Sequence, residues 1–467
     1  MPSAPMPNAY LYTMRYLLFL LSLALVSCGD TTTDLTQTDS VPVQQEIAIK
    51  KGVITAISCK LDVTNSYEVY LPWALVDTEY YPVVVFFDPH GDGRLPVEKY
   101  QAIAEEWGFI LVGSDYTKNG MDANLAMSGA NNLINDVVAR FNVDPARIYV
   151  SGFSGGARIA GGVAAQRMDI TGAICCSAAP PQSIAPRGYV GIAGLGDMNY
   201  LEMQKFQSTV DSLPSLSELI VFDGKHEWPP VAMMETAMLM VSLYQPGNAQ
   251  SGDMNLMSDS LTANVLRQCD TLSKYSCMLE FNLLASIERC EKNFSGSGAI
   301  TARKKKLEGA SCVKNDAQKW KEVESKESDL QKVLQEAILS RDTAWWRENE
   351  DEYFETEKQG AEKFMRQRLR GYTSLLCYTY SNQAFSMNNV HAAEKLVKVY
   401  SIVDPTNSEW AYLQAGLYMR LNMTSEVITS MNKAVELGFR DRVRVEKDPV
   451  FNPLMSNSDF QQILSRM

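Results

Sequence analysis

A serine flanked by glycines occupies the stretch RIYVSGFSGGAR, residues 147–158, in the pattern Gly-x-Ser-x-Gly. A strand-like apolar run precedes Ser154, and small residues with helical spacing follow it, so the serine is expected at a strand-to-helix turn. Glycines let the chain turn sharply there, and the hydroxyl then lies at the positive end of a helix dipole. The pattern predicts Ser154 as a nucleophile.

A serine hydroxyl becomes a good nucleophile only when a base takes its proton. The chain has three histidines, and His226, in FDGKHEWPP, follows both Ser154 and the last expected strand. Asp197, in YVGIAGLGDMNY, lies between them after another expected strand. The order serine, acid, histidine is one in which catalytic triads occur. We therefore predict that Asp197 orients His226, with Asp223 as the alternative acid.

Stabilising the oxyanion of an acyl-transfer reaction needs two amide donors. The first is expected from Gly155, directly after the nucleophile, and the second from the loop FFDPHGDG after an earlier strand. We assign the second donor to the backbone of Gly91 and Asp92. The imidazole of His90 is expected to shape this loop rather than to take part in the chemistry.

Apolar strand-like runs alternate with helical segments from residue 52 to about residue 240. Such an alternation indicates an α/β fold with a mostly parallel sheet that is covered by helices on both faces. We place this domain at residues 49–245. In a parallel sheet the loops after the strands meet at one edge, which is where the predicted site residues lie.

The stretches DPHGDG, DPARIYVSGFSGGARIA, GLGDMNY and GKHEWP resemble an α/β-hydrolase, most closely the esterases grouped with polyhydroxybutyrate depolymerases and feruloyl esterases. The resemblance covers residues 52–245, about two-fifths of the chain. It implies an α/β-hydrolase fold, a Ser-Asp-His triad, cleavage of carboxylic esters and no cofactor. Asp92 departs from the family, in which many members have a small residue at this position.

The N-terminus, MRYLLFLLSLALVSCGD, has one arginine, a short apolar run and small residues. This is the pattern of a secretory signal, and LVSC resembles a bacterial lipobox. We predict a signal peptide at residues 1–28 with a lipid on Cys28, and a flexible tether at residues 29–48. The expected location is the bacterial cell envelope, on its periplasmic or surface face. The alternative is a secreted protein in which Cys28 is incidental.

The secondary-structure pattern of the sequence changes after residue 245, from alternating strand and helix signals to helix signals. Residues 246–260 contain QPGNAQSGDMN and are predicted as a linker, and residues 261–467 as an all-α domain. Two segments near residues 380–440 align with an offset of 34 residues, which pairs Asn388 with Asn422. This is the length of a tetratricopeptide repeat, and such repeats commonly bind proteins. A protein partner of the helical domain is therefore expected.

Charge and residue composition exclude some classes of binding partner. The formal net charge of -12 argues against nucleic-acid binding, which needs a basic surface. No pattern of metal-ligating residues is found in the sequence, so no metal is expected. The helical region contains Cys269, Cys277, Cys290 and Cys312, for which disulfides and buried free thiols are both open.

These observations favour a lipid-anchored serine esterase that works through an acyl-enzyme. Its expected substrates are small-molecule esters or esters carried on polysaccharides. Two alternatives are kept. One is a catalytically silent hydrolase platform whose helical half is a binding scaffold. The other is a serine peptidase on the same fold, because a triad does not by itself distinguish amides from esters.

Overall fold

The structure is a computed structural model that describes residues 49–181, 188–211, 215–244, 251–290, 298–355 and 359–467. The predicted signal peptide 1–28, Cys28 and the tether 29–48 lie outside the described residues. The described residues belong to the second of the two compact units of the chain, Ala48–Met467.

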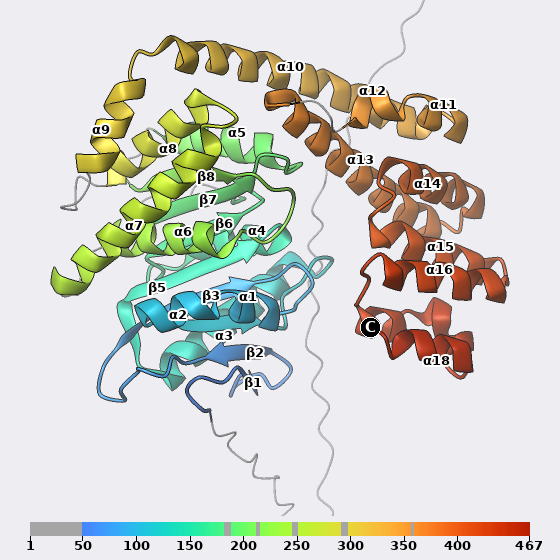
Figure 1. The fold of residues 1–467 in the computed structure, drawn as a ribbon. Coiled ribbons are helices and arrows are strands. Elements are labelled where there is room, and N and C mark those ends of the chain that lie inside the picture. Colours follow the sequence, from blue (N-terminus) through green and yellow to red (C-terminus); the bar gives the residue numbers. More distant parts are fainter. Residues whose placement is uncertain (1–48, 182–187, 212–214, 245–250, 291–297, 356–358) are drawn as a thin grey trace, which may run out of the picture. The chain divides into compact units, whose positions relative to one another are not determined.

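Within the described residues, eight strands form one sheet in the order β1-β2-β4-β3-β5-β6-β7-β8 (Figure 1). The pairs β1/β2 and β2/β4 are antiparallel, and all the others are parallel. The strands are β1 (Thr55–Ser58), β2 (Ser66–Tyr70), β3 (Tyr81–Phe87), β4 (Ile110–Ser114), β5 (Val143–Phe153), β6 (Gly172–Cys176), β7 (Gly188–Gly194) and β8 (Ser217–Phe222). The predicted α/β-hydrolase fold class, with its mostly parallel sheet, is confirmed.

Helices cover both faces of the sheet, and the strands are apolar on both sides for that reason. Along β3, Val83 and Val85 belong to one buried cluster and Val84 and Phe86 to the other, because successive side chains point to opposite faces. The helices described between residues 49 and 244 are α1 (Arg94–Lys99), α2 (Gln101–Trp107), α3 (Ala123–Arg140), α4 (Gly155–Gln166), α5 (Tyr200–Val210) and α6 (Val231–Tyr244). Helices α3 and α4 pack on the first cluster, and α2 and α6 pack on the second.

The described residues after 250 form a helix-rich region without strands. Its α-helices are α7 (Ser251–Leu272), α8 (Cys277–Cys290), α9 (Gly298–Leu307), α10 (Ser311–Ser340), α11 (Thr343–Glu348), α12 (Glu350–Phe354), α13 (Ala361–Ser386), α14 (Val390–Val403), α15 (Ser408–Arg420), α16 (Thr424–Glu436), α17 (Arg442–Lys447) and α18 (Ser458–Leu464), with a 3-10 helix η2 (Pro449–Leu454). Helix α7 begins at Ser251, inside the predicted linker, so that segment is helical from this residue on. Met257, Leu261 and Val265 are buried along one face of α7, at the spacing that a packed helix requires.

The 34-residue offset seen in the sequence has a backbone counterpart. Asn388 and Asn422 both adopt a left-handed conformation, with φ of 54° and 58°, at the turns before α14 and α16. The amide of the next residue makes an equivalent hydrogen bond in both turns. Asn389 donates to the carbonyl of Ala384, and Met423 donates to the carbonyl of Tyr418. Asparagine tolerates this conformation better than most residues. The same helix-to-helix turn therefore occurs twice, 34 positions apart.

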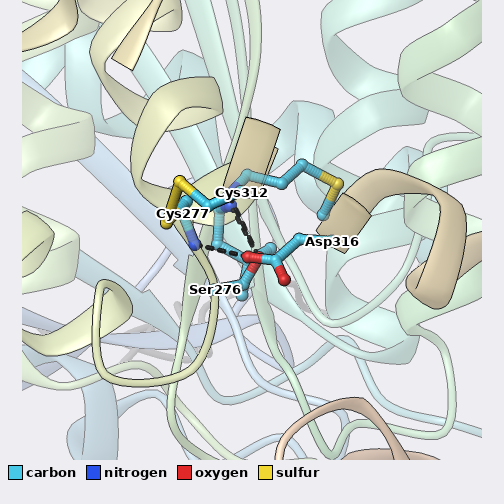
Figure 2. The surroundings of a disulfide bond; sticks show 6 residues. Ser276, Cys277, Cys312 and Asp316 are labelled. Atoms are coloured by element: carbon cyan, nitrogen blue, oxygen red, sulfur yellow. Dashed lines mark hydrogen bonds between the residues drawn. A yellow bond between two sulfur atoms is a disulfide. The ribbon is translucent and has the colours of Figure 1, made fainter. Parts of the chain in front are cut away.

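One of the disulfides left open by the sequence is present, between Cys277 and Cys312 (Figure 2). It joins the first residue of α8 to the second residue of α10. Asp316 supports the same junction, because its carboxylate accepts hydrogen bonds from the hydroxyl of Ser276 at 3.0 Å and the amide of Cys277 at 2.7 Å. Cys269 is a buried free thiol, and the side chain of Cys290 lies outside the described set.

In the part of the chain that the structure describes, none of the helices combines the length and apolar character needed to span a bilayer.

Candidate active site

Ser154 sits at the turn between β5 and α4, with φ of 52° and ψ of -119°. A left-handed φ is costly for a residue with a side chain and marks a backbone held in place by its surroundings. The amide of Ser154 donates to the carbonyl of Cys176 at 2.8 Å, which ties the turn to the end of β6. This is the strained strand-to-helix elbow that the sequence predicts.

The glycines around Ser154 are required by close approaches of the backbone. A Cβ on Gly152 would lie 2.2 Å from the carbonyl oxygen of Gly156, and one on Gly156 would lie 1.9 Å from that of Phe87. Neither backbone contact can yield without moving a strand or the helix. The spacing of the glycines in the sequence therefore reflects how tightly β5, α4 and β3 meet at the elbow.

Ser154, His226 and Asp197 form a hydrogen-bonded chain. The Oγ of Ser154 lies 3.0 Å from Nε2 of His226, whose Nδ1 lies 2.9 Å from Oδ1 of Asp197. The tautomer with the proton on Nδ1 satisfies both contacts, leaving Nε2 to accept from the serine. Asp197 is fully buried and follows β7, whereas His226 is partly exposed and follows β8. The structure thus brings together the three residues that the sequence selects.

The acid is fixed within a short loop after β7. The amides of Leu195 and Gly196 donate to the carbonyls of Phe222 and Gly224, at 2.8 and 2.9 Å. The amide of Asn199 donates to Oδ1 of Asp197 at 2.8 Å, so this oxygen accepts two bonds. The alternative acid, Asp223, lies elsewhere and is engaged by the hydroxyl of Tyr275 at 2.5 Å.

The predicted oxyanion donors lie at the first turn of α4 and in the loop after β3. The amide of Gly155 has no acceptor within its helix, because the first amides of a helix never do. In the loop, the amide of His90 donates to Oδ1 of Asp88 at 2.8 Å and that of Gly91 to the carbonyl of Asp88 at 3.1 Å. Gly93 donates to Asp115 at 3.0 Å.

Three of the four amides from His90 to Gly93 therefore already donate hydrogen bonds, to Asp88 or to Asp115. The amide of Asp92 is the one for which no acceptor is found among the described residues. Of the two predicted loop donors, Asp92 is thus the one free to bind an anion as the loop stands, whereas Gly91 would first have to leave the carbonyl of Asp88.

Asp88 organises this loop from a buried position. Its carboxylate accepts from the indole of Trp228 at 2.8 Å and from the backbone of His90. Burial raises the pKa of Asp88, but hydrogen bonds from His90 and Trp228 outweigh this effect and leave the pKa below its usual value. The His90 imidazole is mostly exposed, at 3.3 Å from Asp88, and this contact raises its pKa. Its position agrees with a role in shaping the loop.

Asn119 lies beside the site, although no sequence pattern indicates it. A Cβ on Gly155 would lie 1.8 Å from Oδ1 of Asn119, so the amide side chain lies directly against the residue after the nucleophile. The backbone of Asn119 donates to the carbonyl of Pro89 at 2.8 Å, which ties it to the oxyanion loop. A single asparagine in a polar loop, TKNG, carries no pattern that would single it out.

Among the described residues, no group of three or more histidine, cysteine, aspartate or glutamate side chains is arranged to hold a metal ion. The chemistry available at the site is that of the hydroxyl, the imidazole, the buried carboxylate and the backbone amides.

No protein-family model matches the chain, and no curated protein matches its sequence. Among solved structures, S-formylglutathione hydrolase from Staphylococcus aureus matches with 10% identity and a TM-score of 0.35, over 40% of this chain and 98% of that one. A feruloyl esterase module from Clostridium thermocellum, complexed with sinapinate, matches with 15% identity and a TM-score of 0.33, over 38% and 82%. Acylaminoacyl peptidase from Pyrococcus horikoshii matches with 14% identity and a TM-score of 0.33, over 44% and 43%. Values this low leave the activity to be argued from the site itself.

Proposed function

We propose that the protein is a serine hydrolase that cleaves carboxylic esters through an acyl-enzyme. The observation that carries the proposal is the hydrogen-bonded chain from Ser154 through His226 to the buried Asp197, at 3.0 and 2.9 Å, on a strained elbow. A buried carboxylate against an imidazole that also touches a serine is costly to assemble and is the arrangement that activates a hydroxyl.

In the first half of the reaction, Oγ of Ser154 attacks the ester carbonyl while Nε2 of His226 takes its proton. Asp197 holds the imidazole in the required tautomer and stabilises the imidazolium. The carbonyl electrons move onto oxygen, which the amide of Gly155 and the amide of Asp92 stabilise, aided by the positive end of α4. The tetrahedral intermediate then collapses, and His226 gives the proton to the departing alcohol.

In the second half, His226 takes a proton from a water molecule, which attacks the acyl group on Ser154. A second tetrahedral intermediate collapses, the proton returns to Oγ, and the carboxylic acid leaves. The same oxyanion donors serve both halves because the carbonyl oxygen occupies the same place.

The substrate we propose is a small-molecule ester or an ester carried on a polysaccharide. Ser154 and His226 are 72 residues apart, and α4, β6, β7, α5 and β8 account for more than half of that length. Among the described residues of this segment there is no further helix or strand that could form a cap, which supports exposed or polymeric esters as substrates.

The test is labelling with a fluorophosphonate probe, which reacts with activated serines. We expect the full chain, and a version that begins at residue 29, to be labelled, and the labelling to be lost in Ser154→Ala and His226→Ala. Asp223→Asn, which changes the rejected acid, is the matched control and should still be labelled. A folded parent without labelling would overturn the proposal and favour a silent platform that binds through its helical half.

Esters and amides are separated by a second measurement. A series of p-nitrophenyl esters of increasing chain length, beside the corresponding p-nitroanilides, is expected to show turnover of the esters only. Faster turnover of the anilides would favour the peptidase alternative.

We further propose that the enzyme is anchored in the bacterial envelope by a lipid on Cys28. The signal-like segment and lipobox support this, as does the disulfide, because disulfides persist mainly in exported proteins. Incorporation of radiolabelled palmitate that is abolished by Cys28→Ala, with release into the soluble fraction, is the expected result. Export of a parent that carries no lipid would favour a plain secretory signal instead.

A further inference from the structure

The loop that carries Asp197 is contacted by the helical half of the chain. Arg368, on α13, donates from Nη1 to the carbonyl of Leu195 at 2.6 Å. This carbonyl belongs to the residue two positions before Asp197. The two residues are 173 positions apart in the sequence, so the contact exists only because α13 packs against this loop.

Two further contacts lie on either side of this bond. The side chain of Gln367 lies so close to Gly196 that a Cβ there would be 2.3 Å from its Oε1. At Gly371, one turn further along α13, a Cβ would be 3.4 Å from Cβ of Met198. The loop around Asp197 is thus bounded by its own strands on one side and by one face of α13 on the other.

Arg368 is itself held by a buried carboxylate. Its Nε lies 2.9 Å from Oε2 of Glu327, on α10, and its Nη2 lies 2.5 Å from the same oxygen. Both side chains are completely shielded from solvent. The guanidinium also lies 4.9 Å from the centre of the Tyr200 ring. Burial raises the pKa of Glu327, while the charge of Arg368 opposes that shift.

Stability alone is a weak explanation for this pair. Removing two charges from water costs several kcal/mol per ion, and apolar residues of similar volume often stabilise a fold as well or better. What an apolar pair cannot do is donate a hydrogen bond to a carbonyl. The guanidinium has five donors in a rigid fork, so it can hold Glu327 with some of them and the Leu195 carbonyl with another.

We propose that Arg368, oriented by Glu327, is a positioning residue for the proposed hydrolase reaction, because it fixes the carbonyl of Leu195 and so places Asp197 against His226. The inference rests on the proposed function for its kinetic consequences. It makes the helical half a structural part of the active site rather than an independent appendage. A displacement of a catalytic group by about 1 Å can cost about 100-fold in rate, so the anchor need only move slightly to matter.

The experiment uses the double variant Arg368→Met/Glu327→Leu in the full chain. Changing both partners avoids leaving a buried charge without its counterion, so the fold is expected to survive. We expect kcat for p-nitrophenyl acetate to fall by about 10- to 100-fold with KM within about twofold, because substrate binding does not involve the pair. The acidic limb of kcat/KM is expected to move to lower pH, since a displaced Asp197 stabilises the imidazolium less.

The matched control is Arg370→Met on the same helix. The guanidinium of Arg370 donates to the carbonyls of Val403 and Phe354, at 2.6 and 2.9 Å, both in the helical half. This variant should lose stability to a similar degree while its kcat and pH profile stay those of the parent. A general effect of loosening α13 would change both variants alike.

A readout that does not depend on turnover completes the test. The chain has only three histidines, so the downfield proton signal of the His226 Nδ1 can be assigned with one variant, His226→Gln. The signal is expected in the parent and in Arg370→Met, and to weaken or move upfield in the double variant. An unchanged signal, kcat and pH profile in a folded double variant would overturn the inference and leave the proposed function intact. Failure of the parent to react with the fluorophosphonate would count against the proposed function alone.

Discussion

The nucleophile and the acid of the proposed triad are held in different ways. The turn of Ser154 is fixed mainly by backbone, since its amide bonds to the carbonyl of Cys176, and Gly152 and Gly156 pack against backbone carbonyls of Gly156 and Phe87. The loop of Asp197 is bonded to β8 on one side, but on the other it meets side chains of α13. The α/β half, residues 49–244, thus builds the elbow by itself, whereas the acid depends on both halves of the chain.

The two sides of the site differ in whether the contacting groups can move to accommodate a substitution. At the elbow, a Cβ added to Gly156 or Gly152 would lie only 1.9 or 2.2 Å from a backbone carbonyl oxygen. These positions therefore require glycine if the elbow is to form. Long side chains on a helix can change rotamer, so the acid side tolerates change at a graded cost. Substitutions on the two sides of the site test this contrast.

Adding one methyl group to the elbow should abolish activity. In Gly156→Ala the new Cβ would lie 1.9 Å from the carbonyl oxygen of Phe87, so α4 or β3 has to move. We expect fluorophosphonate labelling to fall by a factor of about 1,000 or more, with a lower melting temperature, because positioning and the oxyanion donor are both disturbed.

The matched change on the acid side is Gly371→Ala, where the new Cβ would meet Met198 at an ordinary 3.4 Å. It should leave labelling within about twofold and can raise stability by up to about 1 kcal/mol, since alanine favours a helix over glycine. Equal losses of labelling in Gly156→Ala and Gly371→Ala would show that the elbow and the acid loop tolerate substitution to the same degree.

Removing the disulfide should weaken the acid side and spare the elbow. Cys277 and Cys312 are 35 positions apart, and closing such a loop stabilises a fold by about 3 to 4 kcal/mol. The variant Cys277→Ser/Cys312→Ser is expected to unfold at lower denaturant concentration, beginning in α8 and α10. Hydrogen exchange should become faster around Glu327 and stay slow in α4. Faster exchange in α4 to the same extent would contradict a self-supporting elbow.

A smaller change can be made where α13 meets the acid loop. In Gly196→Ala the new Cβ would collide with the end of Gln367, at 2.3 Å, and we expect kcat to fall about tenfold. Gln367→Ala alone should stay within about twofold of the parent. Together the two changes should recover part of the lost kcat, because the nearest atom, Oε1 of Gln367, is removed while its Cβ stays 3.0 Å from the new methyl group. A double variant no better than Gly196→Ala would show that the backbone, not Gln367, limits this loop.

The smallest effect concerns the charge of Asp115, which accepts a hydrogen bond from Gly93 in the oxyanion loop. Burial raises the pKa of Asp115 to about 6, and the carboxylates of Glu68 and Asp92 add to this. Since the folded pKa is above the unfolded one, the associated stability is present below about pH 4 and is lost as the pH rises through about 6.

Asp115→Asn should therefore be more stable than the parent above pH 6, by about 1 kcal/mol once solvent screening is allowed for, and equal to it near pH 4. Denaturant unfolding at the two pH values measures this difference. A constant difference at both values would show that Asp115 does not ionise in this window.

Much of the α/β half was predictable from local sequence patterns. The continuous apolar strands indicated a parallel sheet, and the glycines around Ser154 indicated the elbow, because both reflect short-range constraints. The choice of Asp197 over Asp223 followed from the loop after each strand. In the helical half the 34-residue offset was visible from Asn388 and Asn422, since both positions need a residue that tolerates a left-handed backbone.

The sheet, the elbow and the order of Ser154, Asp197 and His226 after their strands could be predicted from the amino-acid sequence, because periodicity and glycine spacing are properties of neighbouring residues. The contact of Arg368 with Leu195, the position of Asn119 against Gly155 and the pairing of Cys277 with Cys312 became known only from the folded chain. These contacts join segments far apart along the chain. They depend on how whole helices pack, and no local repeat or spacing encodes the partner of a single buried side chain.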